Sequence, residues 1–145
     1  MDKIKINEME INGVLIGSRG LSVETDKSDY DIVCTLAEME RLKTNGYKFN
    51  NIEGSEQYGN DSWGDDFYDV FELYIYGTKI NLMCYKKCKY TEYKAIMTIL
   101  NETKNLMSWN LNVKENRIKI FKIFKEIYLS ADCDATILID RLILK

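Results

Sequence analysis

The chain has 145 residues, of which 46% are apolar and 30% charged, and it contains no histidine and no proline. This length corresponds to one domain that can bury about two-thirds of the surface of the unfolded chain. The absence of histidine excludes Ser-His and Cys-His nucleophile pairs, HExxH zinc sites and phosphohistidine transfer. Any chemistry must therefore use carboxylates, amines, hydroxyls, thiols or a metal ion.

The net charge of −3 is unevenly distributed along the chain. Residues 1–85 carry eight Lys or Arg against sixteen Asp or Glu, a balance of −8, and residues 86–145 carry twelve against seven, a balance of +5. An acidic part beside a basic part suits a site in which carboxylates bind metal ions and basic side chains bind an anion. The alternative is the ordinary variation of a charged surface.

Hydropathy and cysteine content indicate the compartment. No apolar stretch reaches the roughly 20 residues that span a membrane, and the first residues lack the apolar core of a secretory leader. We therefore expect a cytoplasmic protein without membrane contact and with reduced cysteines. Cys84 and Cys88 are spaced like half of a zinc site, but no second close pair exists. We expect all four cysteines to be small buried apolar residues, namely Cys34, Cys84, Cys88 and Cys133.

The first third of the chain predicts two strands and a helix. The apolar run 11–16 ends in Gly17-Ser18-Arg19-Gly20, which indicates a buried strand followed by a tight turn. The run 29–35 is typical of a second strand. A helix is predicted over 35–45 from the spacing of Leu36, Met39, Glu40 and Leu42, with Asn45-Gly46 as its C-terminal cap.

The middle of the chain predicts a strand, a loop and a hairpin. We expect a strand over 47–52 and then a long loop to residue 66, a candidate to cover a site because long loops in compact domains are often functional. Segments 67–76 and 78–85 are expected to form a β-hairpin turning at Gly77, since apolar and polar residues alternate in the first of them.

The remainder of the chain predicts helices. A first helix from Thr91 carries one apolar face, and a second covers 113–129. Segment 135–144 could be a third short helix or a strand. The apolar positions of the two helices are Tyr93, Ile96, Met97, Leu100 and Met107, then Phe121, Phe124 and Tyr128. Lys119, Lys122 and Lys125 share another face of the second helix, which indicates a solvated surface more than a ligand contact.

The strongest chemical signal joins the turn at Gly17-Ser18 to the run Ser28-Asp29-Tyr30-Asp31. A strand that ends in Gly-Ser lets the backbone approach a phosphate and adds a hydroxyl that can bind it. Asp29 and Asp31 are two apart on a strand, so both carboxylates project to one side. They repel each other unless a cation lies between them, and Mg²⁺ bound by carboxylates and substrate phosphates meets that need.

This combination resembles the DNA polymerase β-like nucleotidyltransferase superfamily in its minimal form. The resemblance rests strongly on residues 13–33 and loosely on 67–85, and it is closest to small stand-alone members from bacteriophages and bacterial toxin–antitoxin pairs. It implies an α+β fold: a small mixed β-sheet with helices over residues 1–90, followed by a C-terminal helical part over 91–145 packed on it as one compact unit.

The resemblance also implies roles for individual residues. Gly17, Ser18 and Arg19 would bind the nucleotide phosphates, and Asp29 and Asp31 would hold Mg²⁺ or Mn²⁺. In the family a third carboxylate, on a later strand, helps to hold a second metal ion and activates the attacking hydroxyl.

The matching position for that third carboxylate is Asn81, in the strand Lys79-Ile80-Asn81-Leu82. An asparagine carries no charge and cannot accept a proton, and loss of a general base typically costs about 10²- to 10⁴-fold in rate. Candidate substitutes are Glu72, Asp69 and Asp66.

Three functions remain open from the sequence. The first is an enzyme that transfers a nucleoside monophosphate from a nucleoside triphosphate to a hydroxyl of a protein or RNA acceptor. The second is a catalytically degenerate relative that binds a nucleotide or a protein partner without turnover. RNA binding through the basic C-terminal part ranks below both, because the charge balance there is modest and the chain has only four arginines.

Overall fold

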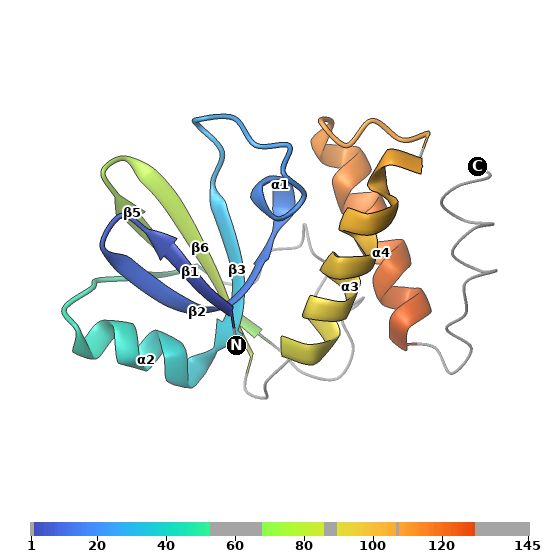
Figure 1. The fold of residues 1–145 in the computed structure, drawn as a ribbon. Helices are drawn as coiled ribbons and strands as arrows, with labels where there is room; N and C mark the ends of the chain where they lie inside the picture. The colour runs from blue at the N-terminus through green and yellow to red at the C-terminus, as the bar shows by residue number, and fades with distance from the viewer. Residues whose placement is uncertain (1, 53–67, 86–89, 107, 130–145) are drawn as a thin grey trace.

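A computed structural model describes residues 2–52, 68–85, 90–106 and 108–129, and it is a small α+β protein with a mixed sheet and helices on both sides (Figure 1). The strands are β1 (Asp2–Ile6), β2 (Met9–Ile16), β3 (Tyr30–Thr35), β4 (Asn50–Ile52), β5 (Tyr68–Ile75) and β6 (Thr78–Tyr85). The helices are α1 (Gly17–Gly20), α2 (Leu36–Thr44), α3 (Tyr90–Thr103), the 3-10 turn η3 (Lys104–Leu106) and α4 (Lys114–Leu129).

The sheet has the strand order β1-β2-β3-β6-β5-β4. Its central pair, β3 and β6, is parallel, and every other neighbouring pair is antiparallel. In the central pair Asp31 is opposite Asn81 and Ile32 is opposite Leu82. Because side chains alternate across a strand, these two rows belong to opposite faces of the sheet.

The two faces are covered by different helices (Figure 1). On one face, buried residues of the sheet such as Ile32 and Leu82 pack with Met39 and Leu42 of α2. On the other face, Val33 and Met83 belong to a cluster that continues into α3 and α4. The predicted apolar face of α3 is confirmed, since Tyr93, Ile96, Met97 and Leu100 are all buried.

Local sequence signals fix the ends of α2. The Thr35 hydroxyl accepts a hydrogen bond from the Glu38 amide at 3.2 Å, which satisfies one free amide of the first turn. The helix ends at Asn45, and Gly46 follows with a φ of +96°, as the predicted cap requires.

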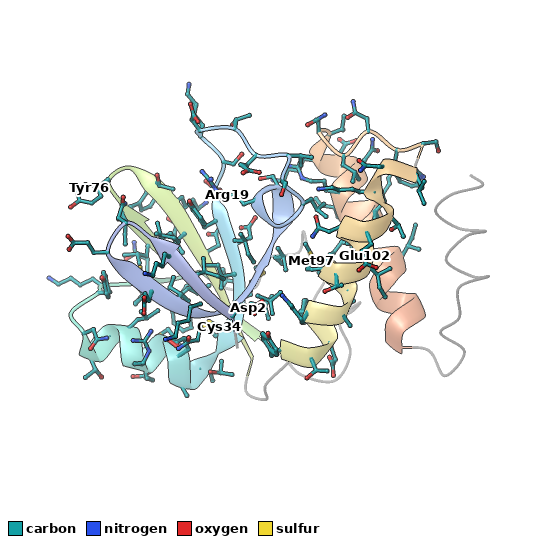
Figure 2. The ribbon with its side chains drawn as sticks, in the orientation of Figure 1. Asp2, Arg19, Cys34, Tyr76, Met97 and Glu102 are labelled. Atoms are coloured by element: carbon teal, nitrogen blue, oxygen red, sulfur yellow. The ribbon has the colours of Figure 1, made fainter. Side chains whose placement is uncertain are left out.

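The predicted hairpin at Gly77 is also confirmed. Ile75 and Thr78 pair across a two-residue turn in which Tyr76 and Gly77 have φ angles of +48° and +81°. Two positive φ angles define the turn whose twist matches that of the flanking strands. Tyr76 lies at the tip with 92% of its surface exposed (Figure 2).

Strand β1 was not predicted. It pairs with β2 through a tight turn at Asn7, whose φ is +56°. The Asp2 carboxylate accepts hydrogen bonds from the Tyr90 hydroxyl and the Lys94 ammonium, so the outer strand is connected to α3. The alternation of Lys3, Ile4, Lys5 and Ile6 is the signal that could have predicted this strand.

Two of the four cysteines are described, and both are buried as expected. The sulfur atoms of Cys34 and Cys84 lie 3.4 Å apart on the paired strands β3 and β6. Their contact and their burial raise the pKa of the Cys34 thiol well above its usual range. This is the environment of inert core residues.

Several expected features lie outside the described residues. They are the loop over 53–67, the third segment over 135–144, Met107, Cys88, Cys133 and the side chains of Phe124, Lys125 and Tyr128. Expected strand 47–52 is described as the shorter β4. Among the described helices, none is long and apolar enough to cross a membrane.

Candidate functional site

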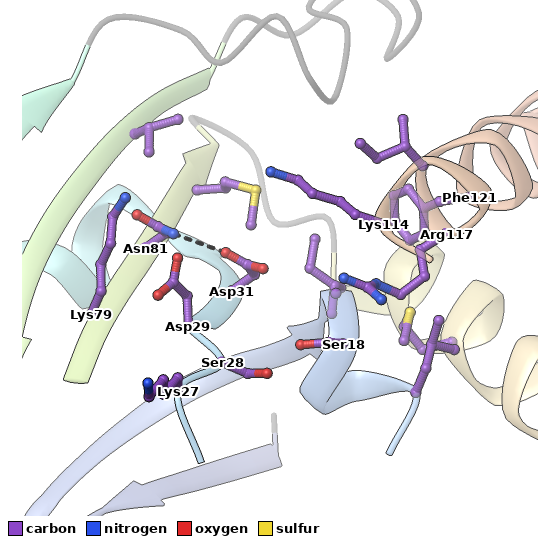
Figure 3. A pocket seen from close by; sticks show the side chains of 17 residues that line it. Ser18, Lys27, Ser28, Asp29, Asp31, Lys79, Asn81, Lys114, Arg117 and Phe121 are labelled. Carbon is purple, nitrogen blue, oxygen red and sulfur yellow. Dashed lines mark hydrogen bonds between the residues drawn. The ribbon is translucent and has the colours of Figure 1, made fainter. Parts of the chain in front are cut away.

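Five of the six site residues singled out by the sequence, all except Arg19, meet at one cavity of about 430 Å³ (Figure 3). Its lining includes Gly17 and Ser18 from the turn after β2, Asp29 just before β3, Asp31 in β3, and Asn81 from β6. Figure 3 shows the two carboxylates and the Asn81 amide pointing into the same space. The expected same-side arrangement of Asp29 and Asp31 is therefore present in the fold.

Asn81 lies directly beside Asp31. The two residues are opposite each other on the parallel strands β3 and β6, and the Asn81 Nδ2 donates a hydrogen bond to Asp31 Oδ1 at 2.9 Å. A carboxylate at this position would repel Asp31, whereas the amide stabilises the ionised form of Asp31 by donating to it. Compared with a carboxylate at the same position, Asn81 carries one negative charge less and adds a hydrogen-bond donor beside Asp31.

Gly17 brings the backbone close to Asp31. Its φ of +69° lies in the left-handed region, and a Cβ at this position would overlap the Asp31 carboxylate. Both observations require a residue without a side chain. The turn is also held from outside, because Asn101 Nδ2 of α3 donates to the Gly20 carbonyl at 2.9 Å and Lys104 Nζ donates to the Leu21 carbonyl at 2.8 Å.

Arg19 does not line the cavity, unlike Ser18. Its guanidinium carbon lies 4.0 Å from the centre of the Tyr30 ring, and its Nε donates to the Ser28 carbonyl at 3.1 Å. These contacts join the turn to the segment that carries Asp29. Arg19 therefore supports the geometry of the site from beside it, and its expected contact with phosphates stays a prediction.

Four basic side chains line the cavity: Lys27, Lys79, Lys114 and Arg117. Lys114 and Arg117 come from the first turn of α4 and face the aspartates across the cavity (Figure 3). Arg117 is held in place by donating through Nη1 to the carbonyls of Leu111 and Asn112, at 2.9 and 3.1 Å. The lysines expected to share a face of α4 do not line the cavity among described side chains, and Lys119 is exposed.

Lys79 connects the cavity to the neighbouring strand β5. Its Nζ lies 3.2 Å from Oε2 of Glu72, which is only 15% exposed. Burial acts to lower the pKa of Lys79, but the hydrogen bond with Glu72 and the nearby charges of Glu72 and Asp29 outweigh it and raise this pKa. Lys79 is therefore a fixed positive charge beside the carboxylates.

Only one of the three candidate substitutes for the missing carboxylate is placed on the site's face of the sheet. Glu72 on β5 is opposite Asn81, so Asp31, Asn81 and Glu72 form one row across three strands. Glu72 does not line the cavity, since it is engaged by Lys79. Asp69 is paired with Cys84 instead, and Asp66 lies outside the described residues.

Apolar side chains also line the cavity. They come from the sheet, from the end of α1 and from α3 and α4, namely Ile16, Leu21, Val70, Met83, Met97, Ile118 and Phe121. The Phe121 ring stacks on Tyr93 with ring centres 5.9 Å apart. One cavity therefore combines charged side chains with apolar surface of the kind that binds the flat part of a ligand.

The carboxylate oxygens in the cavity suit a divalent cation. Two carboxylates project together into the cavity, and a glycine allows the backbone to approach one of them closely. Mg²⁺ is commonly bound by one or two carboxylates with substrate phosphates and water completing its shell. Within the described ranges, no group of three or more acidic or cysteine side chains is gathered to hold a metal without such a substrate.

Searches against protein-family models, curated proteins and solved structures find no match to this chain. The interpretation of the site therefore depends on its geometry and on the sequence resemblance.

Proposed function

We propose that this protein is a metal-dependent nucleotidyltransferase, which transfers a nucleoside monophosphate from a nucleoside triphosphate to a hydroxyl acceptor on a protein or an RNA. The observation that carries the proposal is the convergence of the Gly17-Ser18 turn, Asp29 and Asp31 with Lys114 and Arg117 at one cavity. These groups are respectively suited to bind phosphate oxygens, a divalent cation and a polyanion.

Each group of residues has a defined task in this proposal. Asp29 and Asp31 hold Mg²⁺ or Mn²⁺, which when bound neutralises phosphate charge and polarises the α-phosphorus toward attack. The Ser18 hydroxyl and the backbone at Gly17 bind the outer phosphates. Lys114 and Arg117 stabilise the charge that develops on the departing pyrophosphate. The apolar surface around Phe121 accepts the base.

Transfer is tested with labelled nucleoside triphosphates, Mg²⁺ or Mn²⁺, and mixed protein and RNA acceptors. We expect the wild-type chain to label an acceptor and Asp29→Ala/Asp31→Ala to abolish labelling. The matched control is Glu24→Ala, an exposed acidic residue of the loop before β3 that does not line the cavity. Clear nucleotide binding without transfer to any acceptor would reject the enzyme.

The second candidate is a protein that binds a nucleotide, or a protein partner, without turnover. Asn81 favours it, because an amide beside Asp31 cannot take a proton from the acceptor hydroxyl. The variant Asn81→Asp separates the two functions. A gain in transfer would identify the wild-type chain as a degenerate enzyme, whereas a loss would show that the amide belongs to the working site.

A further inference from the structure

The charges that line the cavity are unusual for a site with two divalent cations. Two such ions lie about 3.5–4 Å apart and require several carboxylates to offset their mutual repulsion. The described lining provides two, Asp29 and Asp31. The next position in the row, Asn81, turns an N–H toward Asp31 Oδ1, where a second cation would need an oxygen ligand.

Lys79 is placed where a second positive charge would be needed. Tyr30 on β3 pairs with Ile80 on β6, so Lys79 is the β6 position next to Asp29, on the same face as Asn81. Its side chain is one-third exposed and lines the cavity. The ion pair with Glu72 at 3.2 Å holds the ammonium in place.

We propose that the Lys79 ammonium takes the place of a second divalent cation, so that the site binds its nucleotide with one metal ion per nucleotide. This inference rests on the proposed function, since it concerns the same cavity and the same nucleoside triphosphate.

The orientation of Asn81 agrees with this assignment. Its amide nitrogen satisfies Asp31 Oδ1, and Gly17 lies against the other carboxylate oxygen, Oδ2. The hydrogen bond from Asn81 thus fixes the orientation of the Asp31 carboxylate. The arrangement needs no cation between β3 and β6, and Lys79 supplies the positive charge one position earlier on β6.

The test counts metal ions per bound nucleotide by equilibrium dialysis, with radioactive Mn²⁺ and a triphosphate analogue whose α,β-bridging oxygen is replaced by CH₂. We expect one Mn²⁺ per retained nucleotide in the wild-type chain and two in Lys79→Met/Asn81→Asp, which removes the ammonium and adds a carboxylate. Lys119→Met/Asn81→Asp is the matched control and should retain one, because Lys119 is exposed and does not line the cavity.

Single variants keep the inference testable if the double variant does not fold. Lys79→Met should weaken retention of the analogue about tenfold or more, in line with the loss of one hydrogen bond to a charged group. Lys79→Arg should restore it, and circular dichroism checks that each variant is folded. Equal retention in wild type and Lys79→Met would overturn the role of Lys79.

The outcomes separate this inference from the proposed function. Two Mn²⁺ per nucleotide in the wild-type chain, or one in the folded Lys79→Met/Asn81→Asp variant, would overturn the inference and leave the proposed function standing. A folded wild-type chain that retains no nucleotide would overturn both.

Discussion

The two faces of strands β3 and β6 differ in what they contain, although they are built from alternating residues of the same short segments. On the face covered by α2, Ile32 and Leu82 are opposite each other and fully buried. One residue earlier, Asp31 and Asn81 are opposite each other and line the cavity. Within a single residue step the two strands therefore change from a buried apolar pair to a polar pair that lines the cavity.

The helices explain why the faces differ. α2 packs its buried residues Met39 and Leu42 directly on the sheet, which leaves the α2 face apolar throughout the central strands. α3 and α4 share a core with Val33 and Met83, but next to this core the cavity remains between α4 and the row of Asp31 and Asn81.

Substitution of two adjacent residues of β6, Leu82 on one face and Asn81 on the other, is the strongest test of this comparison. Leu82→Ala should lower the free energy of unfolding by about 2–5 kcal/mol, because it leaves a void under α2. Asn81→Ala removes one hydrogen bond at the cavity and should cost about 1 kcal/mol. Urea titration of both variants measures the difference. Equal losses would mean that the two faces contribute alike to stability.

The sequence predicted most elements of this fold because the spacing of apolar residues differs clearly between the strand segments and the helical segments. Alternation in β5 and the spacing of buried residues in α3 are local signals, and both elements were found where they were expected. The position of Asn81 beside Asp31 was implied by the family resemblance, and the register of β3 and β6 places the two residues opposite each other.

The basic residues of the cavity were not predicted individually. Lys114 and Arg117 reach it only because α4 crosses opposite the sheet, a tertiary arrangement with no signal in the local sequence. Lys79 was visible as a strand residue, but its partner Glu72 comes from a neighbouring strand. Arg19 was expected at the phosphates because of its place in the turn, and its stacking on Tyr30 depends on the loop that brings the two together.

Two glycines with positive φ, one at the cavity and one at the hairpin turn, allow the same substitution to be compared at the two places. Gly17→Ala should lower the free energy of unfolding by about 1–3 kcal/mol and also abolish nucleotide retention, because its Cβ would displace the Asp31 carboxylate. Gly77→Ala adopts a similar φ with no atom within 4 Å, so it should cost about 1–2 kcal/mol and leave retention unchanged. Thermal unfolding and dialysis measure the two effects.

The contrast would fail if both alanine variants lost nucleotide retention. That result would mean that retention follows overall stability and does not depend on the contact between Gly17 and Asp31.

Loss of the contact between Asp2 of β1 and α3 should give the smallest change in the free energy of unfolding. The hydrogen bond from Lys94, opposed by slight burial and aided by Tyr90, lowers the pKa of Asp2. A lowered pKa in the folded state stabilises the protein above the pKa of the unfolded state, and this contribution disappears as the pH falls through the folded value. Asp2→Asn should therefore cost a few tenths of a kcal/mol at pH 7, because the pair is exposed.

The pH series checks the sign of this effect. The difference in unfolding free energy between wild type and Asp2→Asn should shrink progressively below about pH 4. A difference that is independent of pH would assign the effect to packing at β1 and not to charge.

Calorimetric titration with each of the four common nucleoside triphosphates, with and without Mg²⁺, tests the central claim that the polar row of this sheet is a metal–nucleotide site. We expect the wild-type chain to bind at least one of them only when Mg²⁺ is present. Asp29→Asn/Asp31→Asn, which keeps the shape of both side chains, should remain folded and lose this binding. Equal affinity in wild type and variant, or binding that ignores Mg²⁺, would contradict the account.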